Sequence, residues 1–221
     1  MKLVPRESVM PGPRDERGVL SARIVAAARD EFAQNGWAGT TIRAVARVAD
    51  VDPALVYHYF GSKKGLLDAA TNPPQKFLEN VAKVWTTPTE QLGRALVEVL
   101  LANWADEEIG PTLRAIMQTA AHEQTTREKL GRVVASSLMG VSHIGSDERD
   151  RLVRSGLISS QMMGFGLMRY IWKIEPIASM SEEEVIAAMG PNLQRYVDGD
   201  LTPPGSPWSP PPFLALGIGE C

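Results

Sequence analysis

The sequence predicts an all-α protein. Apolar residues recur at helical spacing along most of the chain, and no segment shows the sustained apolar–polar alternation that indicates strands. Residues that cap helices and glycines that end them bound the helical stretches. The 221 residues, 44% of them hydrophobic and 22% charged, suffice for a folded core, which excludes a disordered or collagen-like chain.

Three features of the composition bear on the cellular setting. No stretch reaches the roughly 18 consecutive apolar residues that a membrane span needs. The first 18 residues are polar and lack the apolar region of a secretory signal. The one cysteine is Cys221, which excludes internal disulfides and multi-cysteine zinc sites. We therefore expect a cytoplasmic protein without membrane association and without a metal or other cofactor.

The first predicted helix is Ser21–Asn35. Ile24 and Phe32 lie on its apolar face, and Gly36 follows at the position where a left-handed residue commonly ends a helix. The polar, proline-containing residues 1–18 before it predict a flexible arm.

Three short helices are predicted next. A Thr-Thr pair caps Ile42–Val48, Asp52 caps Pro53–Phe60, and Ser62 caps Lys63–Ala70. A proline opens the second of them, at the position where its missing N–H costs nothing. Two adjacent prolines then end the helical pattern.

Six longer helical stretches are predicted after that, for a total of about nine or ten helices. The last begins at a capping box, Ser181-Glu182-Glu183-Glu184, in which serine and glutamate cap the helix reciprocally. Six prolines in the last 20 residues predict an unstructured tail. The stretches are Gln75–Trp85, Thr89–Ala105, Pro111–His122, Thr125–Val141, Asp147–Ile174 and Ser181–Tyr196.

The short helices near the N-terminus point to a function. A helix-turn-helix has three helices within about 40 residues and a tight turn between the second and the third. The first three predicted helices have this pattern: Ser21–Asn35, Ile42–Val48 and Pro53–Phe60. The third is short enough to enter a DNA major groove, which is about 12 Å wide. Helical spacing turns Leu55 or Val56 toward the core and leaves Ala54, Tyr57 and His58 facing outward.

The charge is unevenly distributed along the chain. Residues 1–71 carry a net charge of +2 and residues 72–221 a net charge of −5. A mildly basic front on an acidic body suits a protein that brings one end to a polyanion.

The stretch from Arg23 to Leu67 resembles the DNA-binding domain of the TetR family of bacterial transcriptional regulators. The shared features are an aromatic-rich third helix followed by lysine and paired leucines, here VYHYFGSKKGLLDAA, and a Thr-Thr pair before the second helix. The resemblance implies a sequence-specific DNA-binding regulator, a repressor in the pattern of the family, and no enzymatic activity.

The resemblance also implies a role for each matching position. Helix two would contact phosphate and a base edge, the start of helix three would lie close to bases, and the residues that follow would hold the DNA backbone. In that order, the positions are Thr41 and Arg43; Pro53, Ala54 and Leu55; and Tyr57, His58 and Lys63. Because Ala54 and Leu55 offer no hydrogen bonds, we expect much of the specificity to rest on Arg43 and on DNA shape.

Asp50 departs from the family pattern, which usually has glycine in the turn between helices two and three. Aspartate tolerates left-handed backbone better than most residues, so we expect the turn to survive with some strain.

The C-terminal part, RYIWKIEPIA followed by PNLQRY, is similar to a branch common in actinobacterial regulators, in which the last two long helices form a four-helix dimer interface. Gly156, Ser160 and Gly164 fall on one stripe of the Asp147–Ile174 helix, where small residues allow another helix to approach closely. With Tyr196 they form the expected homodimer interface, and a dimer would read a palindromic operator. The alternative for the same stripe is packing within the chain.

The family resemblance implies a small-molecule pocket between the middle helices and the Asp147–Ile174 helix, and methionine and tryptophan are residues that line adaptable apolar sites. The ordinary alternative for each of these residues is core packing. The proposed ligand is an apolar or amphipathic effector that releases the protein from its operator. The expected lining residues are Trp104, Met117, Gln118, His122, Gln161, Met162 and Trp172, with Trp85, Asn103, Met139 and Met163 as further candidates.

These expectations divide the chain into an arm (1–18), a helix-turn-helix domain (19–70), a helical effector-binding and dimerisation domain (71–200) and a Pro-rich tail (201–221). Two alternatives to a ligand-released repressor stay open. One is a helical enzyme or ligand carrier that retains the three-helix front, against which stands the lack of a nucleophile–base or metal constellation. The other is an activator or a regulator that senses no ligand.

Overall fold

The computed structural model describes residues 13–137 and 144–201 of the chain. Within these residues the protein has ten α-helices, one 3₁₀ turn and one π-helical turn, and no strand, so the predicted all-α class is confirmed. No helix in the described part is both long and apolar enough to cross a membrane.

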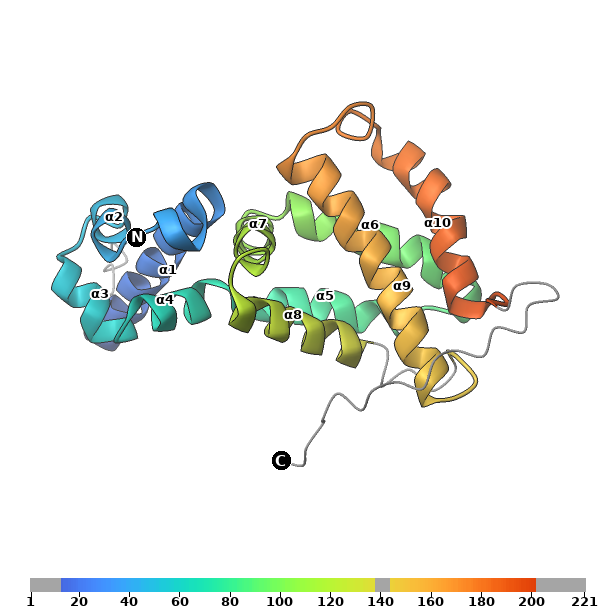
Figure 1. Cartoon of the computed structure of the whole chain (residues 1–221), viewed down its shortest axis with the longest axis horizontal. Helices are drawn as coiled ribbons and strands as arrows, with labels where there is room; N and C mark the ends of the chain where they lie inside the picture. The colour runs from blue at the N-terminus through green and yellow to red at the C-terminus, as the bar shows by residue number, and fades with distance from the viewer. Residues whose placement is uncertain (1–12, 138–143, 202–221) are drawn as a thin grey trace, which may run out of the picture.

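A small lobe of four helices lies at one end of the molecule, and the remaining helices form a larger body beside it (Figure 1). The lobe consists of α1 (Pro13–Gly39), α2 (Ile42–Val48), α3 (Pro53–Phe60) and α4 (Lys63–Ala70). The last three have the bounds that their caps predict.

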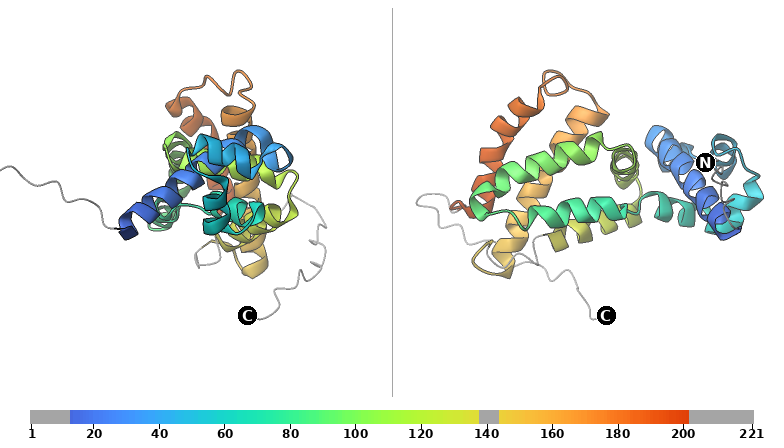
Figure 2. Two further views of the ribbon diagram at one scale, coloured as in Figure 1. Left: turned by 90° about the vertical axis from the view of Figure 1, so that its left-hand side faces the viewer. Right: turned by 180° about the vertical axis from the view of Figure 1, so that it is seen from behind.

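The body, seen from two further sides in Figure 2, begins with α5 directly after the proline pair. The predicted single helix Thr89–Ala105 is a 3₁₀ turn followed by an α-helix, and the predicted Asp147–Ile174 helix changes into a π-helical turn after Gly166. The elements are α5 (Gln75–Val84), η1 (Thr89–Gln91), α6 (Leu92–Ala105), α7 (Ile109–Ala120), α8 (Gln124–Ser137), α9 (Glu148–Gly166), η2 (Leu167–Ile171) and α10 (Glu182–Asp198).

The first helix is longer than expected at its N-terminal end. It begins at Pro13, so residues 13–18 are helical rather than part of the arm. Proline suits the first helical turn, because its fixed φ matches the helix and its missing N–H is not needed there. At the other end Gly36 has φ 61°, and this left-handed residue interrupts the helix where the sequence predicts its end. The arm prediction for residues 1–12 and the tail prediction for residues 202–221 lie outside the described residues.

Two apolar cores hold the molecule together. Ile24, Phe32, Val45 and Val56 are fully buried in the core of the small lobe, and Ala115 of α7 joins them from the body. The second core lies inside the body, where α6, α9 and α10 meet; it includes Leu92, Val97, Ile158, Val185 and Leu193. The small lobe is therefore packed directly on α7 rather than joined to the body only by the chain.

Polar contacts also join the lobe to the body. Nε of Arg29 on α1 donates to the carbonyl oxygen of Ala70 at 3.2 Å, and its Nη1 lies 3.7 Å from a carboxylate oxygen of Glu108. Asp68 on α4 forms an ion pair with Lys129 on α8. Both contacts lie at the end of α4, the helix that leads from the lobe into the body.

Side chains cap both ends of α10. At its start Ser181 and Glu184 form the predicted capping box. At its end Nη1 of Arg154 on α9 donates to the carbonyl oxygens of Tyr196 at 2.9 Å and Gly199 at 3.1 Å. The guanidinium is held in place by Asp150, whose two carboxylate oxygens each lie 3.0 Å from Arg154 Nε. These contacts attach α9 to the C-terminal end of α10.

Candidate functional site

The turn between α2 and α3 keeps the geometry of a helix-turn-helix in spite of its aspartate. Asp50 has φ 51°, the left-handed conformation that the sequence predicts. The side chain of Arg23 on α1 donates to the Asp50 carbonyl oxygen at 3.4 Å, a contact that helps to hold the turn. Aspartate therefore occupies the place of the expected glycine without disrupting the motif.

Short polar side chains begin α2 and α3. Thr41 Oγ1 accepts a hydrogen bond from the Ala44 N–H at 3.1 Å, and Asp52 Oδ1 accepts one from the Ala54 N–H at 2.7 Å. Accepting that bond leaves the proton of the Thr41 hydroxyl available to donate. Thr41 is exposed, so its hydroxyl can reach an oxygen atom outside the protein.

The third helix buries one face and exposes the other. Val56 is fully buried, while Leu55 and Tyr57 are 36% and 54% exposed. Ala54 and His58 are also exposed. Of the two candidates for the inward position, the structure therefore places Val56 in the core and Leu55 on the outer surface.

The neighbouring Pro53 is partly buried at the start of the same helix. Thr41 caps α2 and the exposed Arg43 lies in its first turn, so all three residues belong to the two helices on either side of the α2–α3 turn. The exposed side of α3 thus offers an apolar and aromatic surface, while the exposed guanidinium stands on α2.

Lys63 differs from its expected role. Its ammonium group donates to the carbonyl oxygen of Trp37 and lies 4.4 Å from the centre of the Trp37 ring. Burial lowers the pKa of this ammonium group. Lys63 is therefore engaged within the chain, because the last residues of α1, beyond the interruption at Gly36, bring Trp37 to the start of α4. Sequence spacing does not reveal this contact.

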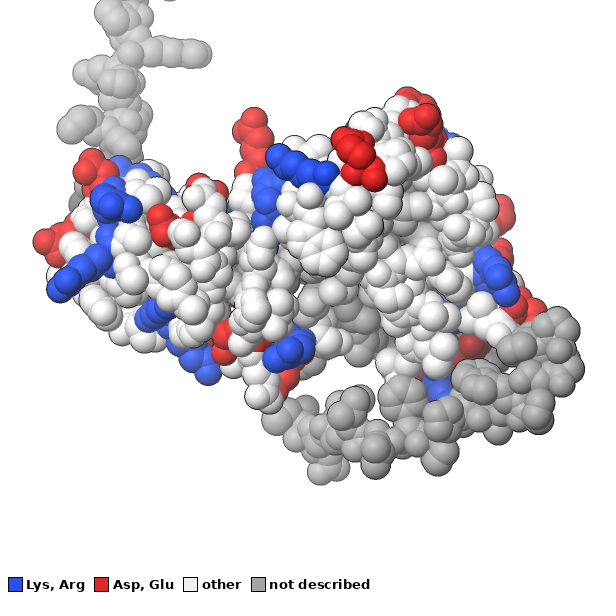
Figure 3. Space-filling view, turned by 45° about the horizontal axis from the view of Figure 1, so that its top comes forward, with Lys and Arg blue, Asp and Glu red and all other residues white. Residues whose placement is uncertain are grey.

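Other cations remain on the surface of the small lobe. Lys64, Arg43 and Arg47 are exposed, and their side chains make no hydrogen bond or ion pair within the described residues. Figure 3 shows several basic side chains on this lobe, interspersed with acidic ones. Lys64 is the free cation beside Lys63 at the start of α4.

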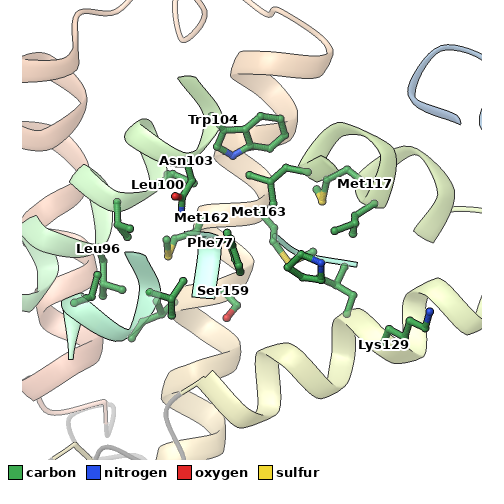
Figure 4. A pocket seen from close by; sticks show the side chains of 18 of the residues that line it. Phe77, Leu96, Leu100, Asn103, Trp104, Met117, Lys129, Ser159, Met162 and Met163 are labelled. Atoms are coloured by element: carbon green, nitrogen blue, oxygen red, sulfur yellow. The ribbon is translucent and has the colours of Figure 1, made fainter. Parts of the chain in front are cut away.

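A cavity of about 610 Å³ lies inside the body, between α5, α6, α7, α8 and α9. Its wall includes three residues expected in a ligand pocket, Trp104, Met117 and Met162, and the further candidates Trp85, Asn103 and Met163. Figure 4 shows Trp104, Asn103 and Met162 near one another, with Lys129 at the opposite end from Leu96.

Four of the expected lining residues lie elsewhere, so the prediction was wrong for them. Gln118 follows Met117 and is turned away from the cavity, since successive helical residues differ by about 100°. His122 is exposed beyond the end of α7. Gln161 points to α10, where its Nε2 donates to the Tyr196 hydroxyl at 3.3 Å. Trp172 is 59% exposed, because the chain leaves the helix after the π-helical turn. Met139 lies outside the described residues.

Several lining residues carry no helical signal that would have identified them. Thr71, Asn72 and Pro73 connect α4 to α5 and form part of the cavity wall. Phe77 of α5 and Lys129 of α8 also line it. The cavity therefore reaches the segment by which the small lobe is attached to the body.

No other helix of the described chain packs closely against the glycines of the small-residue stripe on α9. A Cβ atom added at Gly156 or Gly164 would meet no atom within 4 Å apart from the local chain. Ser160 is exposed, and its hydroxyl donates to the Leu157 carbonyl oxygen at 2.8 Å. Tyr196 of α10 is partly buried, with its hydroxyl accepting the bond from Gln161. Within the described residues, packing inside one chain does not account for the stripe.

Comparison with known proteins supports this two-part architecture. Residues 24–70 match the family model described as bacterial regulatory proteins, tetR family, and residues 90–197 match a tetracyclin repressor-like C-terminal domain. The HTH-type transcriptional regulator BetI of Burkholderia mallei is 30% identical over 128 residues, which cover 53% of this chain and 62% of BetI. The chain thus spans less than two thirds of that relative.

Solved structures agree with the fold over most of the chain. A TetR-family regulator from Streptomyces coelicolor superposes with a TM-score of 0.61 and 25% identity, covering 84% of this chain and 98% of that one. A TetR-like transcriptional regulator from Rhodococcus sp. RHA1 has a TM-score of 0.58 and 18% identity, with 84% and 97% covered. The turn between α2 and α3 is intact, and models of one family match residues 24–70 and 90–197. The chain therefore belongs to the TetR family of bacterial regulatory proteins.

Proposed function

We propose that the protein is a sequence-specific DNA-binding transcriptional regulator that acts as a homodimer on a two-fold symmetric operator. The observation that carries the proposal is the intact helix-turn-helix, with its third helix exposed along Leu55 and Tyr57 and with Arg43 free beside it. A helix of this kind reads base edges in the major groove, and two copies about 34–36 Å apart would read a palindrome. A carrier or an enzyme would have no need for this surface.

In this proposal Thr41 and Arg43 contact phosphate and a base edge, and Pro53, Ala54 and Leu55 approach the bases. Tyr57 and His58 contact the DNA backbone. Lys64 takes the backbone role first expected of Lys63, because Lys64 is exposed and the ammonium group of Lys63 is bound to Trp37.

The direct test is binding of the purified protein to the DNA flanking its own gene, titrated with salt against a scrambled control. Nanomolar binding that is selective for a palindrome and weakens steeply with salt would support the proposal. Equal binding to the scrambled DNA, at every salt concentration, would contradict it.

Single substitutions in the small lobe should separate base reading from backbone contact. Arg43→Ala should cost about 1–3 kcal/mol at one base pair and relax the preference there. Lys64→Ala should weaken binding to all sequences alike and lower the salt slope by about one. Fluorescence anisotropy on the operator and on its single-base variants measures both effects. Lys83→Ala, on the exposed surface of α5, is the control that should change neither. Equal, salt-independent losses from Arg43→Ala and Lys64→Ala would count against these roles.

The dimer interface is proposed to run along α9 and α10, with Gly156, Ser160, Gly164 and Tyr196 in it. The support is that the small-residue stripe on α9 leaves open space beside it in the single chain. Such a stripe allows a second helix to approach closely.

A large side chain on this stripe should therefore separate the subunits without unfolding them. A Cβ at position 164 meets nothing within 4 Å beyond its own stretch of helix, but in the proposed dimer a leucine there would overpack the interface and weaken association at least tenfold. Sedimentation velocity over a concentration series measures the dimer dissociation constant, and circular dichroism checks the fold. Gly131→Leu on α8, where a Cβ is equally unhindered, is the matched control. An unchanged dissociation constant for Gly164→Leu would place the interface elsewhere.

We further propose that an apolar or amphipathic effector binds in the cavity and releases the protein from DNA, so that the protein acts as a repressor. The support is the position of the cavity: its wall includes residues 71–73, which follow α4, and Lys129, which is paired with Asp68 of α4. A ligand in the cavity would contact the segment that connects the small lobe to the body. Release requires that the ligand bind the DNA-free arrangement more tightly than the DNA-bound one.

A further inference from the structure

The cavity is lined mainly by apolar side chains, so its few polar groups are informative about the ligand. Both threonines among the described lining residues are already engaged: Thr71 Oγ1 donates to the Leu67 carbonyl oxygen at 2.8 Å, and Thr126 hydrogen-bonds to the Glu123 carboxylate. The other polar lining residues are Asn72, Asn103, Lys129 and Ser159.

Asn103 is the most buried of these four, with 3% of its surface exposed. Its Oδ1 accepts a hydrogen bond from Nδ2 of Asn80 on α5 at 2.7 Å. Asn80 itself does not line the cavity, so it orients the Asn103 amide from behind. Within the described part of the chain, Nδ2 of Asn103 donates to no protein atom. In Figure 4 Asn103 lies in the cavity wall close to Trp104 and Met162.

A buried donor without a partner is costly, by about 1–3 kcal/mol. The pairing with Asn80 leaves the two N–H bonds of the Asn103 amide as the free half of that side chain. A ligand oxygen at this point would satisfy the donor, whereas a pure hydrocarbon would bury it unsatisfied. Asn103 therefore distinguishes ligands that carry an acceptor at one position from ligands that do not.

The charge of the lining limits the ligand further. Among the described lining residues Lys129 is the charged one, and its ammonium group is paired with the Asp68 carboxylate. A charged ligand group placed among the apolar lining would lose its hydration without gaining a free counter-charge, which is strongly unfavourable. A neutral ligand avoids this cost.

We propose that the cavity selects a neutral, largely apolar molecule with a carbonyl or ether oxygen that accepts a hydrogen bond from Nδ2 of Asn103. Asn80 is a positioning residue that keeps the amide in this orientation. The inference rests on the proposed function in one respect, namely that the cavity is the effector site.

The test compares three probes in the full-length protein that each carry a benzene ring and a six-carbon chain: hexylbenzene, 1-phenylhexan-1-one and 4-hexylbenzoate. Each displaces N-phenyl-1-naphthylamine, a neutral dye that fluoresces in apolar sites, and the concentration for half displacement is measured. We expect the ketone to displace the dye at a concentration at least tenfold lower than hexylbenzene does, and the benzoate to be weaker than the ketone. Hydrophobicity alone would favour hexylbenzene, so a preference for the ketone reports the hydrogen bond.

Substitutions assign the preference to the amide. Asn103→Leu keeps a similar volume without a donor, so the preference for the ketone should be lost and hexylbenzene should bind at least as tightly as the ketone. Asn80→Ala should reduce the preference in part, because the amide is no longer oriented. Ser159→Ala removes another polar group of the wall and should leave the preference intact. Since the readout is a ratio of two probes, a general loss of stability would not produce this pattern.

Each other outcome has a definite meaning. Equal displacement by the ketone and hexylbenzene in the wild-type protein, survival of the preference in Asn103→Leu, or tightest binding of the benzoate would overturn the inference while leaving the DNA-binding proposal untouched. Failure of the dye and of all three probes to bind would overturn the effector part of the proposed function, and the inference with it.

Discussion

Gly93→Ala is expected to destabilise the protein by about 3 kcal/mol, at the upper end of the range for overpacking. A Cβ at position 93 would lie 2.4 Å from the Gly190 carbonyl oxygen and 2.5 Å from the Gln194 backbone nitrogen. These atoms belong to the backbone of α10, so no side chain can turn aside to make room. The helices α6 and α10 would have to separate, and the body core between them would loosen.

The same movement would break a polar contact. The Gly93 N–H donates to Gln194 Oε1 at 2.8 Å, and Gln194 Nε2 donates to the Thr89 carbonyl oxygen at 2.9 Å. Gln194 thus satisfies an N–H in the first turn of α6, a group that has no partner within its own helix. Because this bond depends on the close approach of the two helices, its loss adds to the steric effect.

Thermal unfolding followed by circular dichroism measures the change. For a protein of this size, about 3 kcal/mol corresponds to a fall in Tm of roughly 6–12 °C. Gly131→Ala on α8 is the matched control: a Cβ there meets nothing within 4 Å, and alanine favours a helix over glycine by up to about 1 kcal/mol. A Tm for Gly93→Ala within 2 °C of the wild-type value, judged against about 2–4 °C per kcal/mol, would rule out the close packing of α6 on α10.

Arg154→Ala is expected to have an effect of similar size, about 3 kcal/mol. Arg154 is buried, and its guanidinium binds Asp150 and the last carbonyl groups of α10 at the same time. Its removal leaves the Asp150 carboxylate without its cation and the end of α10 without its donor. The C-terminal end of α10 should then separate from α9.

Chemical denaturation at constant pH measures the loss. Arg94→Ala is the control, since Arg94 pairs with Glu98 in the same i,i+4 spacing but on an exposed surface, where such a pair contributes about 0.3–0.5 kcal/mol. A loss for Arg154→Ala no larger than that for Arg94→Ala would show that burial adds nothing to this pair.

The difference should depend on pH. Burial alone would raise the pKa of the Asp150 carboxyl, but hydrogen bonds from Ser146 and Arg154 outweigh it and hold that pKa below its usual value of 3.8. The contribution of this carboxylate is therefore present above that value and is lost as the pH falls through the lower pKa of the folded state. The wild-type and Arg154→Ala proteins should in part converge in stability below about pH 4.

Much of the local structure could be predicted from single residues. Asp52 and Ser62 begin helices at the expected positions, Ser181 begins the last one, and Gly36 interrupts the first where its end is predicted. These outcomes follow from interactions within one turn of the chain: a side-chain oxygen and the N–H groups that follow it, or a residue that tolerates a left-handed backbone. Asp50 behaves in the same way, because its tolerance of positive φ is a property of aspartate itself.

The candidate site could be predicted only in part, because it depends on contacts between distant segments. Helical spacing places Met117 on one face of α7, but spacing alone does not tell which face another helix covers. Gln161 has the spacing of a cavity residue and is bound by Tyr196 instead. Residues 71–73 have no helical pattern, and they reach the cavity only because α4 ends beside it.

The all-α class, the positions of the helix caps and the turn between α2 and α3 could be predicted from the sequence alone, because each arises from neighbours within a few residues. The tertiary structure alone decided that Lys63 is bound by Trp37, that Arg154 closes α10, and that the amide of Asn103 is left free at a cavity. Each of these depends on which helices lie side by side. Burial and hydrogen bonding between segments far apart in the chain are set by packing, and packing is a property of the whole fold.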